Sequence, residues 1–154
     1  MGREHDRCEA VPIDAAFHVN GSRLEYARGP VLEWYLNGPR GVEQGFLLQE
    51  RPSGSGAVVL RIGVEGLEPV AVPAEHAVLL TAESTAVLRV DEMHAFDATG
   101  RELESSMEVS NGAIVLRVND RDARYPLRVD PLYGAEPIKL LSPTVKASEG
   151  FGVA

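Results

Sequence analysis

The sequence has one cysteine, no long apolar run and no excess of basic residues. Cys8 has no second cysteine to pair with, which excludes an internal disulfide and a cysteine-rich metal site, and we interpret it as a surface thiol. No apolar stretch approaches the roughly 18 residues that a transmembrane helix needs, so no membrane insertion is expected. Acidic residues are spread along the chain and give a formal net charge of -8, which argues against nucleic acid as a partner.

The start of the chain lacks an apolar segment. Its opening residues, MGREHDRCEA, are mostly polar where a signal peptide would carry its apolar core. We predict that residues 1–14 form a disordered polar leader. Two interpretations of location stay open: an extracellular or cell-envelope location as part of a longer precursor, and a cytoplasmic location.

The rest of the sequence is typical of a folded domain. Hydrophobic residues make up 44% and charged residues 25% of the 154 positions, which is a globular balance. Short β-branched runs separated by Gly, Pro, Asn and Ser fill residues 15–132. Turn signals recur about every 8 to 12 residues, which leaves no room for helical crossovers. We therefore predict an all-β fold, an antiparallel β-sandwich of roughly eight to ten short strands.

Particular segments predict particular strands and turns. Asn20-Gly21 lies between two short apolar segments and predicts a hairpin with a type I′ turn, and Asn111-Gly112 lies in a second such turn. Residues 74–83 fit either two helical turns or a buried strand, and we favour a strand. The alternation in residues 31–36 places Trp34 on one face with Leu32 and Leu36. The predicted structural core consists of Trp34, Phe46, Leu60, Ile62, Leu116 and Leu127.

No motif for catalysis, metal binding or cofactor binding is present. The histidines are isolated from one another, the glycine-rich segment 54–56 has no phosphate-loop ending, and no Gly-x-Ser-x-Gly elbow occurs. Four aspartates stand at expected strand ends, where turn formation is the simpler interpretation: Asp97, Asp120, Asp122 and Asp130. We expect no cofactor and no enzyme, although two carboxylates about 5 to 10 Å apart would suffice for a glycosidase.

Four segments carry a family resemblance: EWYLN at 33–37, GVEQGF at 41–46, AFDATGREL at 95–103 and YPLRVDP at 125–131. Together they resemble the β-rich module that precedes FG-GAP repeats in large bacterial surface and secreted proteins. Lys139-Leu140 and EGFGVA at 149–154 resemble the opening of an FG-GAP repeat, the blade unit of integrin-like β-propellers. The resemblance implies a β-sandwich-like domain at 15–132, and a linker with an incomplete first repeat at 133–154. Downstream β-propeller repeats are the implied partners.

Three hypotheses of function follow. The first is a non-catalytic structural or adhesive module of a bacterial cell-surface or secreted protein, acting as a cap or spacer next to a β-propeller. The second is a lectin-like, glycan-binding module in which Trp34, Tyr35 and Tyr26 contact the sugar. The third is a small carboxylate-dependent glycoside hydrolase. An exposed aromatic platform would favour the second hypothesis, and a buried Trp34 with a featureless surface would favour the first.

Overall fold

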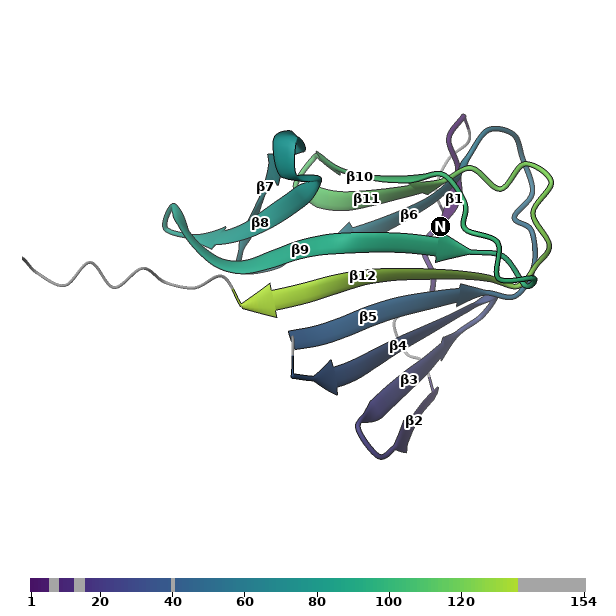
Figure 1. Cartoon of the computed structure of the whole chain (residues 1–154), viewed down its shortest axis with the longest axis horizontal. Coiled ribbons are helices and arrows are strands. Elements are labelled where there is room, and N and C mark those ends of the chain that lie inside the picture. The colour runs from purple at the N-terminus through teal and green to yellow at the C-terminus, as the bar shows by residue number, and fades with distance from the viewer. Residues whose placement is uncertain (6–8, 13–15, 40, 136–154) are drawn as a thin grey trace, which may run out of the picture.

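The computed structural model describes residues 1–5, 9–12, 16–39 and 41–135, and these ranges fold into two antiparallel sheets (Figure 1). The smaller sheet has the order β1-β6-β11-β10: Gly2–Arg3, Val58–Gly63, Ala113–Val118 and Ser105–Ser110. The larger sheet has the order β2-β3-β4-β5-β12-β9-β8-β7: Ala16–Asn20, Arg23–Arg28, Val31–Gly38, Gly41–Leu48, Leu127–Ala135, Thr85–Phe96, Ala77–Ala82 and Glu68–Val72.

The two sheets form a β-sandwich, which confirms the predicted all-β antiparallel fold. The strand expected within 74–83 is present as β8, and a short 3-10 turn, η1 (Pro73–Glu75), precedes it. Among the described residues, no helix is long and apolar enough to cross a membrane.

Alternate residues of the facing strands make the core between the sheets. In the larger sheet, Phe46 lies opposite Val129, and in the smaller sheet Leu60 lies opposite Leu116. Side chains that share a face of a sheet alternate with those on the other face, so every second residue of these strands points inward. Of the predicted core residues, Phe46, Leu60, Leu116 and Leu127 belong to this cluster and Ile62 packs against it.

Strands β2, β3 and β4 fan out past the smaller sheet (Figure 1). Every residue of β2 is exposed, and the side chains of Phe17 and Val19 are 68% and 58% exposed. The larger sheet therefore has a covered part, which carries the core, and an uncovered part, which ends at β2. We call the uncovered part, β2 and β3, the overhang.

The hairpins differ in their turn type. The β2–β3 hairpin is confirmed, but Asn20 pairs with Arg23, so the turn residues are Gly21 and Ser22. Gly21 alone has a positive φ, of 61°, and a positive φ only at the first central residue is the signature of a type II′ turn in place of the expected type I′. In the β10–β11 hairpin both Asn111 and Gly112 have positive φ, as a type I′ turn requires.

The structure changes two expectations for the ends of the domain. Residues 1–14 do not all form a disordered leader, because Gly2–Arg3 pairs with β6 and the Arg3 side chain is 3% exposed. At the other end, β12 continues to Ala135, so residues 133–135 belong to a strand and not to a linker. Cys8 and residues 136–154, which include the segments from which an FG-GAP repeat was expected, lie outside the described residues.

Candidate functional site

A buried carboxylate lies at the centre of the most polar cluster on the inner face of the larger sheet. Glu33 of β4 is 7% exposed and accepts hydrogen bonds from the Tyr35 hydroxyl at 2.6 Å and from the Gln44 side-chain amide at 2.7 Å. The Arg28 guanidinium donates a further, very short hydrogen bond to the second carboxylate oxygen. All of these groups lie on one face because β3, β4 and β5 are in register, with Tyr35 opposite Gln44.

The hydrogen bonds hold Glu33 in its charged form. Burial alone would raise the pKa of Glu33, but the hydrogen bonds from Tyr35, Arg28 and Gln44 together lower the pKa below its ordinary value. Burial and the bond to Glu33 raise the pKa of the Tyr35 hydroxyl. A carboxylate with a lowered pKa and three internal donors is a poor general acid or base at neutral pH, so this cluster serves the fold.

Three aromatic rings form a row that runs from the overhang onto β4. Phe17 of β2 lies 6.1 Å from Tyr26 of β3, and Tyr26 lies 6.2 Å from Tyr35 of β4 with the two rings at 89°. These centroid separations are within the range of favourable aromatic pairs. The row leads from the exposed edge of the sheet to the Glu33 cluster.

Trp34 lies on the opposite face of the sheet from this row. It is 5% exposed, as expected of a core residue, but it is adjacent to Tyr35 in the strand and so points away from the space between the sheets. The Arg23 guanidinium lies 4.3 Å from the indole centroid, and Gly45 lies directly opposite with no side chain to displace the ring. Trp34 therefore lies on the opposite face of the sheet from Tyr35 and Tyr26, so the three side chains do not share one surface.

A cleft of about 370 Å³ opens between the two sheets beside the Glu33 cluster. Its walls are mostly aliphatic side chains from both sheets, and its polar lining residues are Tyr35, Gln44, Glu65 and Tyr133. Burial raises the pKa of Tyr133, whose hydroxyl has no hydrogen-bond partner among the described residues. The volume is within the range of small-molecule pockets, but the hydrogen bonds of Tyr35 and Gln44 are already directed into the protein.

A second, more polar depression of about 580 Å³ lies at the end of the smaller sheet where β6 and β10 begin and β11 ends. Arg3 donates to the carbonyl oxygens of Pro52 and Gly56 and forms a 2.6 Å ion pair with Asp120. Burial alone would raise the pKa of Asp120, but the hydrogen bonds from Arg3 and Tyr125 lower it. These contacts attach β1 to the loop that precedes β6. Arg3 and Asp120 therefore stabilise the fold.

The predicted turn aspartates have different roles. Asp97 caps a turn as predicted, since its Oδ1 accepts hydrogen bonds from the backbone and the hydroxyl of Thr99. Asp130 does not lie in a turn: it is within β12, opposite His94 of β9. Its position is a correction to the sequence analysis, and it follows from the extension of β12 past Pro131 to Ala135.

Asp130 lies in a shallow depression of about 200 Å³ together with Glu43, Glu92 and His94. Burial, with a smaller contribution from Glu43, raises the pKa of Asp130. Asp130 follows the inward-facing Val129, so it lies on the outer face of the sheet, whereas Glu33 lies on the inner face. The two most perturbed strand carboxylates therefore do not converge in one cleft. Among the described residues, no group of three histidine, cysteine or acidic side chains could hold a metal ion.

Sequence reasoning missed Arg3 and Glu33, two buried charged residues with several internal hydrogen bonds each. Arg3 stands in a polar leader, and its partner Asp120 is too distant in the chain for any spacing rule. Glu33 did carry a signal, because it shares the 31, 33, 35 face of β4 with Val31 and Tyr35.

Comparison of the chain with protein-family models, with curated proteins and with solved structures finds no match.

Proposed function

We propose that this chain is a non-catalytic structural and adhesive module of a bacterial cell-surface or secreted protein, where it acts as a cap or spacer next to a β-propeller. The family resemblance of residues 33–37, 41–46, 95–103 and 125–131 supplies the context for this proposal. The location that follows is extracellular or in the cell envelope, as part of a longer precursor.

The observation that carries the proposal is the use of the buried polar groups. In the described ranges, the buried polar and charged residues are Arg3, Glu33, Gln44, Asp97 and Asp120. Each of them makes hydrogen bonds to other groups of this same chain. An active site needs polar groups directed at a space that a substrate can enter, whereas here they are directed at strands and turns.

The path of the chain also supports a role beside another module. β12 leads into residues 136–154, which resemble the start of an FG-GAP repeat, and β12 lies between β5 and β9 in the interior of the larger sheet. A segment joined to an interior strand is attached to the most extensively paired part of the domain. This attachment suits a cap or spacer that holds its neighbour in a fixed position.

The test uses the longer gene product. If the gene encodes FG-GAP repeats after residue 154, we expect amide hydrogen exchange in the first repeat to become faster when residues 1–135 are deleted, because one repeat needs a neighbour to bury its sheet faces. A later repeat, distant from the deletion, serves as the internal control. A gene without downstream repeats, or a first repeat that is equally protected in both proteins, contradicts the proposal.

A glycan-binding module is the second candidate, and the aromatic row Phe17–Tyr26–Tyr35 is the observation that favours it. Sugars stack on exposed aromatic faces, and Phe17, at the outer end of this row, is 68% exposed. The test is a glycan panel probed with the purified chain and with Tyr26→Ala. Binding that Tyr26→Ala abolishes and Trp34→Phe leaves unchanged supports this candidate, and a panel without any binding rejects it.

A further inference from the structure

We propose that two copies of this chain pair edge to edge through β2, antiparallel, about a two-fold axis at His18. The pairing would join the two larger sheets into one continuous sheet. This inference does not depend on the proposed function, because it rests only on the geometry and composition of β2.

β2 is the last strand of the larger sheet, and in the part of the chain that the structure describes its outer edge pairs with no other strand. All five of its residues are exposed. Figure 1 shows β2 at the far end of the overhang, away from the smaller sheet, so the second sheet does not obstruct an approach to this edge. An open edge presents backbone N–H and C=O groups that a further strand can pair with.

The other sheet edges carry features that discourage such pairing. β7, at the opposite end of the larger sheet, contains Glu68 and Pro69, and Pro69 has no backbone N–H to donate. In the smaller sheet, β10 carries Glu108 and β1 has only two residues. β2 reads Ala-Phe-His-Val-Asn and contains no acidic residue, lysine, arginine or proline. It is the one edge strand of the described sheets that lacks these protections.

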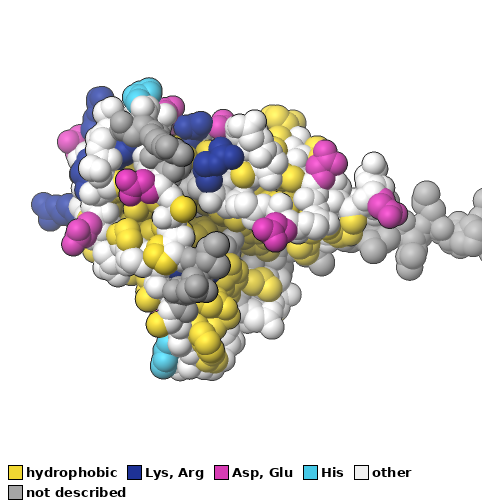
Figure 2. Space-filling view, turned by 180° about the vertical axis from the view of Figure 1, so that it is seen from behind, with side chains coloured by type: hydrophobic (Ala, Val, Ile, Leu, Met, Phe, Trp, Pro, Cys, Tyr) yellow, Lys and Arg dark blue, Asp and Glu magenta, His cyan; other side chains and the backbone are white. Residues whose placement is uncertain are grey.

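β2 also carries the most exposed large hydrophobic side chains of the described residues. Phe17 is 68% and Val19 58% exposed, against 41% for Val70 on β7. Phe17 and Val19 alternate with His18, so both lie on the inner face of the overhang, where Phe17 is opposite Tyr26 and Val19 is opposite Leu24. Figure 2 shows hydrophobic side chains gathered on the lower part of the molecule, where β2 and β3 lie.

The sequence of β2 fits a copy of itself. An antiparallel pair centred on His18 places Phe17 of one copy opposite Val19 of the other, and the two-fold axis repeats this contact. Aromatic side chains opposite β-branched ones are favourable cross-strand pairs. Ala16 then lies opposite Asn20, with no like charges facing each other. A shift of register by one residue would lose the Phe17–Val19 contact, and a shift by two would replace its two copies with a single Phe17–Phe17 or Val19–Val19 contact, so the register centred on His18 keeps the most apolar pairs.

Charge also favours this edge as the meeting point. Two chains that each carry a formal net charge of -8 repel one another, so association is easiest where the surface is locally neutral. β2 has no acidic or basic residue apart from His18. On the neighbouring β3, Arg23 and Glu25 neutralise one another in a 2.6 Å ion pair.

Sedimentation velocity of the purified 154-residue chain, from low micromolar to submillimolar concentration, tests the association. We expect a reversible shift from the mass of one chain to the mass of two. Val19→Lys should keep the chain monomeric over the whole range, because it places a charge in the centre of the pair. Val70→Lys on the opposite edge is the matched control and should associate like the wild type. A wild type that is monomeric throughout, or a dimer that survives Val19→Lys, overturns the proposal.

Cross-linking tests the register and does not depend on the folding of the lysine variants. In a Cys8→Ser background, His18→Cys brings two thiols together at the two-fold axis, where opposite Cα atoms of antiparallel strands are about 4.5 to 5.5 Å apart, within disulfide range. Asn20→Cys is the matched control, since each thiol would face Ala16 of the other copy. Rapid oxidation to a covalent dimer for His18→Cys alone supports the register. Equal rates for both variants, or none for either, contradict it.

Discussion

Arg3 and Asp120 lie 117 positions apart in the chain and form an ion pair of 2.6 Å in which both side chains are 3% exposed. The pair connects the first residues of the chain to the loop after β11. Asp120 also accepts a hydrogen bond from the Tyr125 hydroxyl, so one carboxylate links three segments. Loss of Arg3 removes the buried partner of Asp120 and leaves that carboxylate an ion pair of 3.2 Å with Arg51, whose side chain is 48% exposed.

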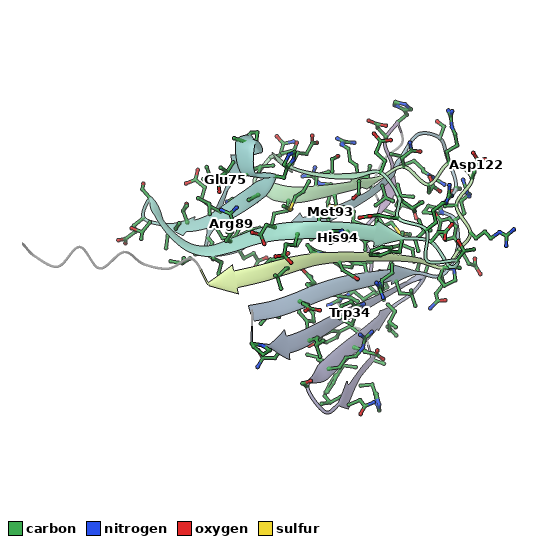
Figure 3. The ribbon with its side chains drawn as sticks, viewed as in Figure 1. Trp34, Glu75, Arg89, Met93, His94 and Asp122 are labelled. Atoms are coloured by element: carbon green, nitrogen blue, oxygen red, sulfur yellow. The ribbon has the colours of Figure 1, made fainter. Side chains whose placement is uncertain are left out.

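The first prediction concerns this buried pair. Arg3→Ala should lower the free energy of unfolding by about 3 kcal/mol, because Asp120 loses its buried partner and keeps the 3.2 Å ion pair with Arg51, whose side chain is 48% exposed. Urea unfolding followed by Trp34 fluorescence measures the change. The control is Glu75→Ala, which breaks the 2.7 Å pair with Arg89, where Glu75 is 56% exposed (Figure 3). That variant should cost less than about 1 kcal/mol, and an equal cost for both would show that burial of the Arg3 pair contributes nothing.

The second prediction concerns acid unfolding and Asp97. Hydrogen bonds, first from the Thr99 hydroxyl and also from backbone N–H groups, lower the pKa of Asp97 below its ordinary value. A lowered pKa in the folded state means that this stabilisation is complete above the unfolded pKa of about 3.9 and is lost as the pH falls toward the folded value. Asp97→Asn should therefore be less stable at neutral pH and show a shallower loss of stability below about pH 4. An unchanged slope in urea titrations would contradict this role.

The third prediction concerns the contact of Gly45 with Trp34. A Cβ at position 45 would overlap the indole ring, so Gly45→Ala should destabilise the fold by about 1 to 3 kcal/mol. Gly63→Ala is the control, because nothing lies within 4 Å of a Cβ there. In a Trp34→Leu background the cost of Gly45→Ala should fall, which a double-mutant cycle measures. If Gly45→Ala costs as much stability in the Trp34→Leu background as in the wild type, the loss comes from the backbone at position 45 and not from the indole ring.

The fourth prediction compares two tyrosine hydroxyls. The Tyr133 hydroxyl is buried without a hydrogen-bond partner among the described residues, so Tyr133→Phe should be neutral or stabilise the protein by about 1 kcal/mol. The Tyr35 hydroxyl donates to Glu33 at 2.6 Å, so Tyr35→Phe should destabilise it by about 1 to 3 kcal/mol. Thermal unfolding of both variants gives the comparison. The opposite order would mean that Tyr133 has a partner that the geometry does not reveal.

Local patterns predicted the strands well, because a strand and its turn are decided by neighbouring residues. The alternation of Val58, Leu60 and Ile62 and the Asn111-Gly112 turn are examples. Such patterns reveal which residues share a face, but not always which face is covered. β4 carries apolar residues on both faces, and only its packing under the smaller sheet shows that Val31, not Trp34, joins the inter-sheet core.

Charged residues were harder to place from sequence, since their burial depends on partners that are distant in the chain. The residues around Arg3 are mostly polar, as in a terminus exposed to solvent. In the structure, however, Asp120 and two carbonyl oxygens compensate the charge of Arg3. Glu33 likewise depends on Gln44 from the next strand and on Arg28 from the previous one. The periodicity of apolar residues along the chain does not reveal such contacts between distant side chains. The buried polar residues could therefore be identified only from the structure.

The interior position of β12 has a mechanical consequence. Its hydrogen bonds to β5 and β9 run perpendicular to the strand, as in any antiparallel pair. Tension applied along the chain after Ala135 would therefore load both ladders in shear, with many bonds sharing the force at once. An edge strand under the same pull could be peeled away one bond at a time. The pairing of β12 on both sides would therefore give the domain resistance to tension applied at this point.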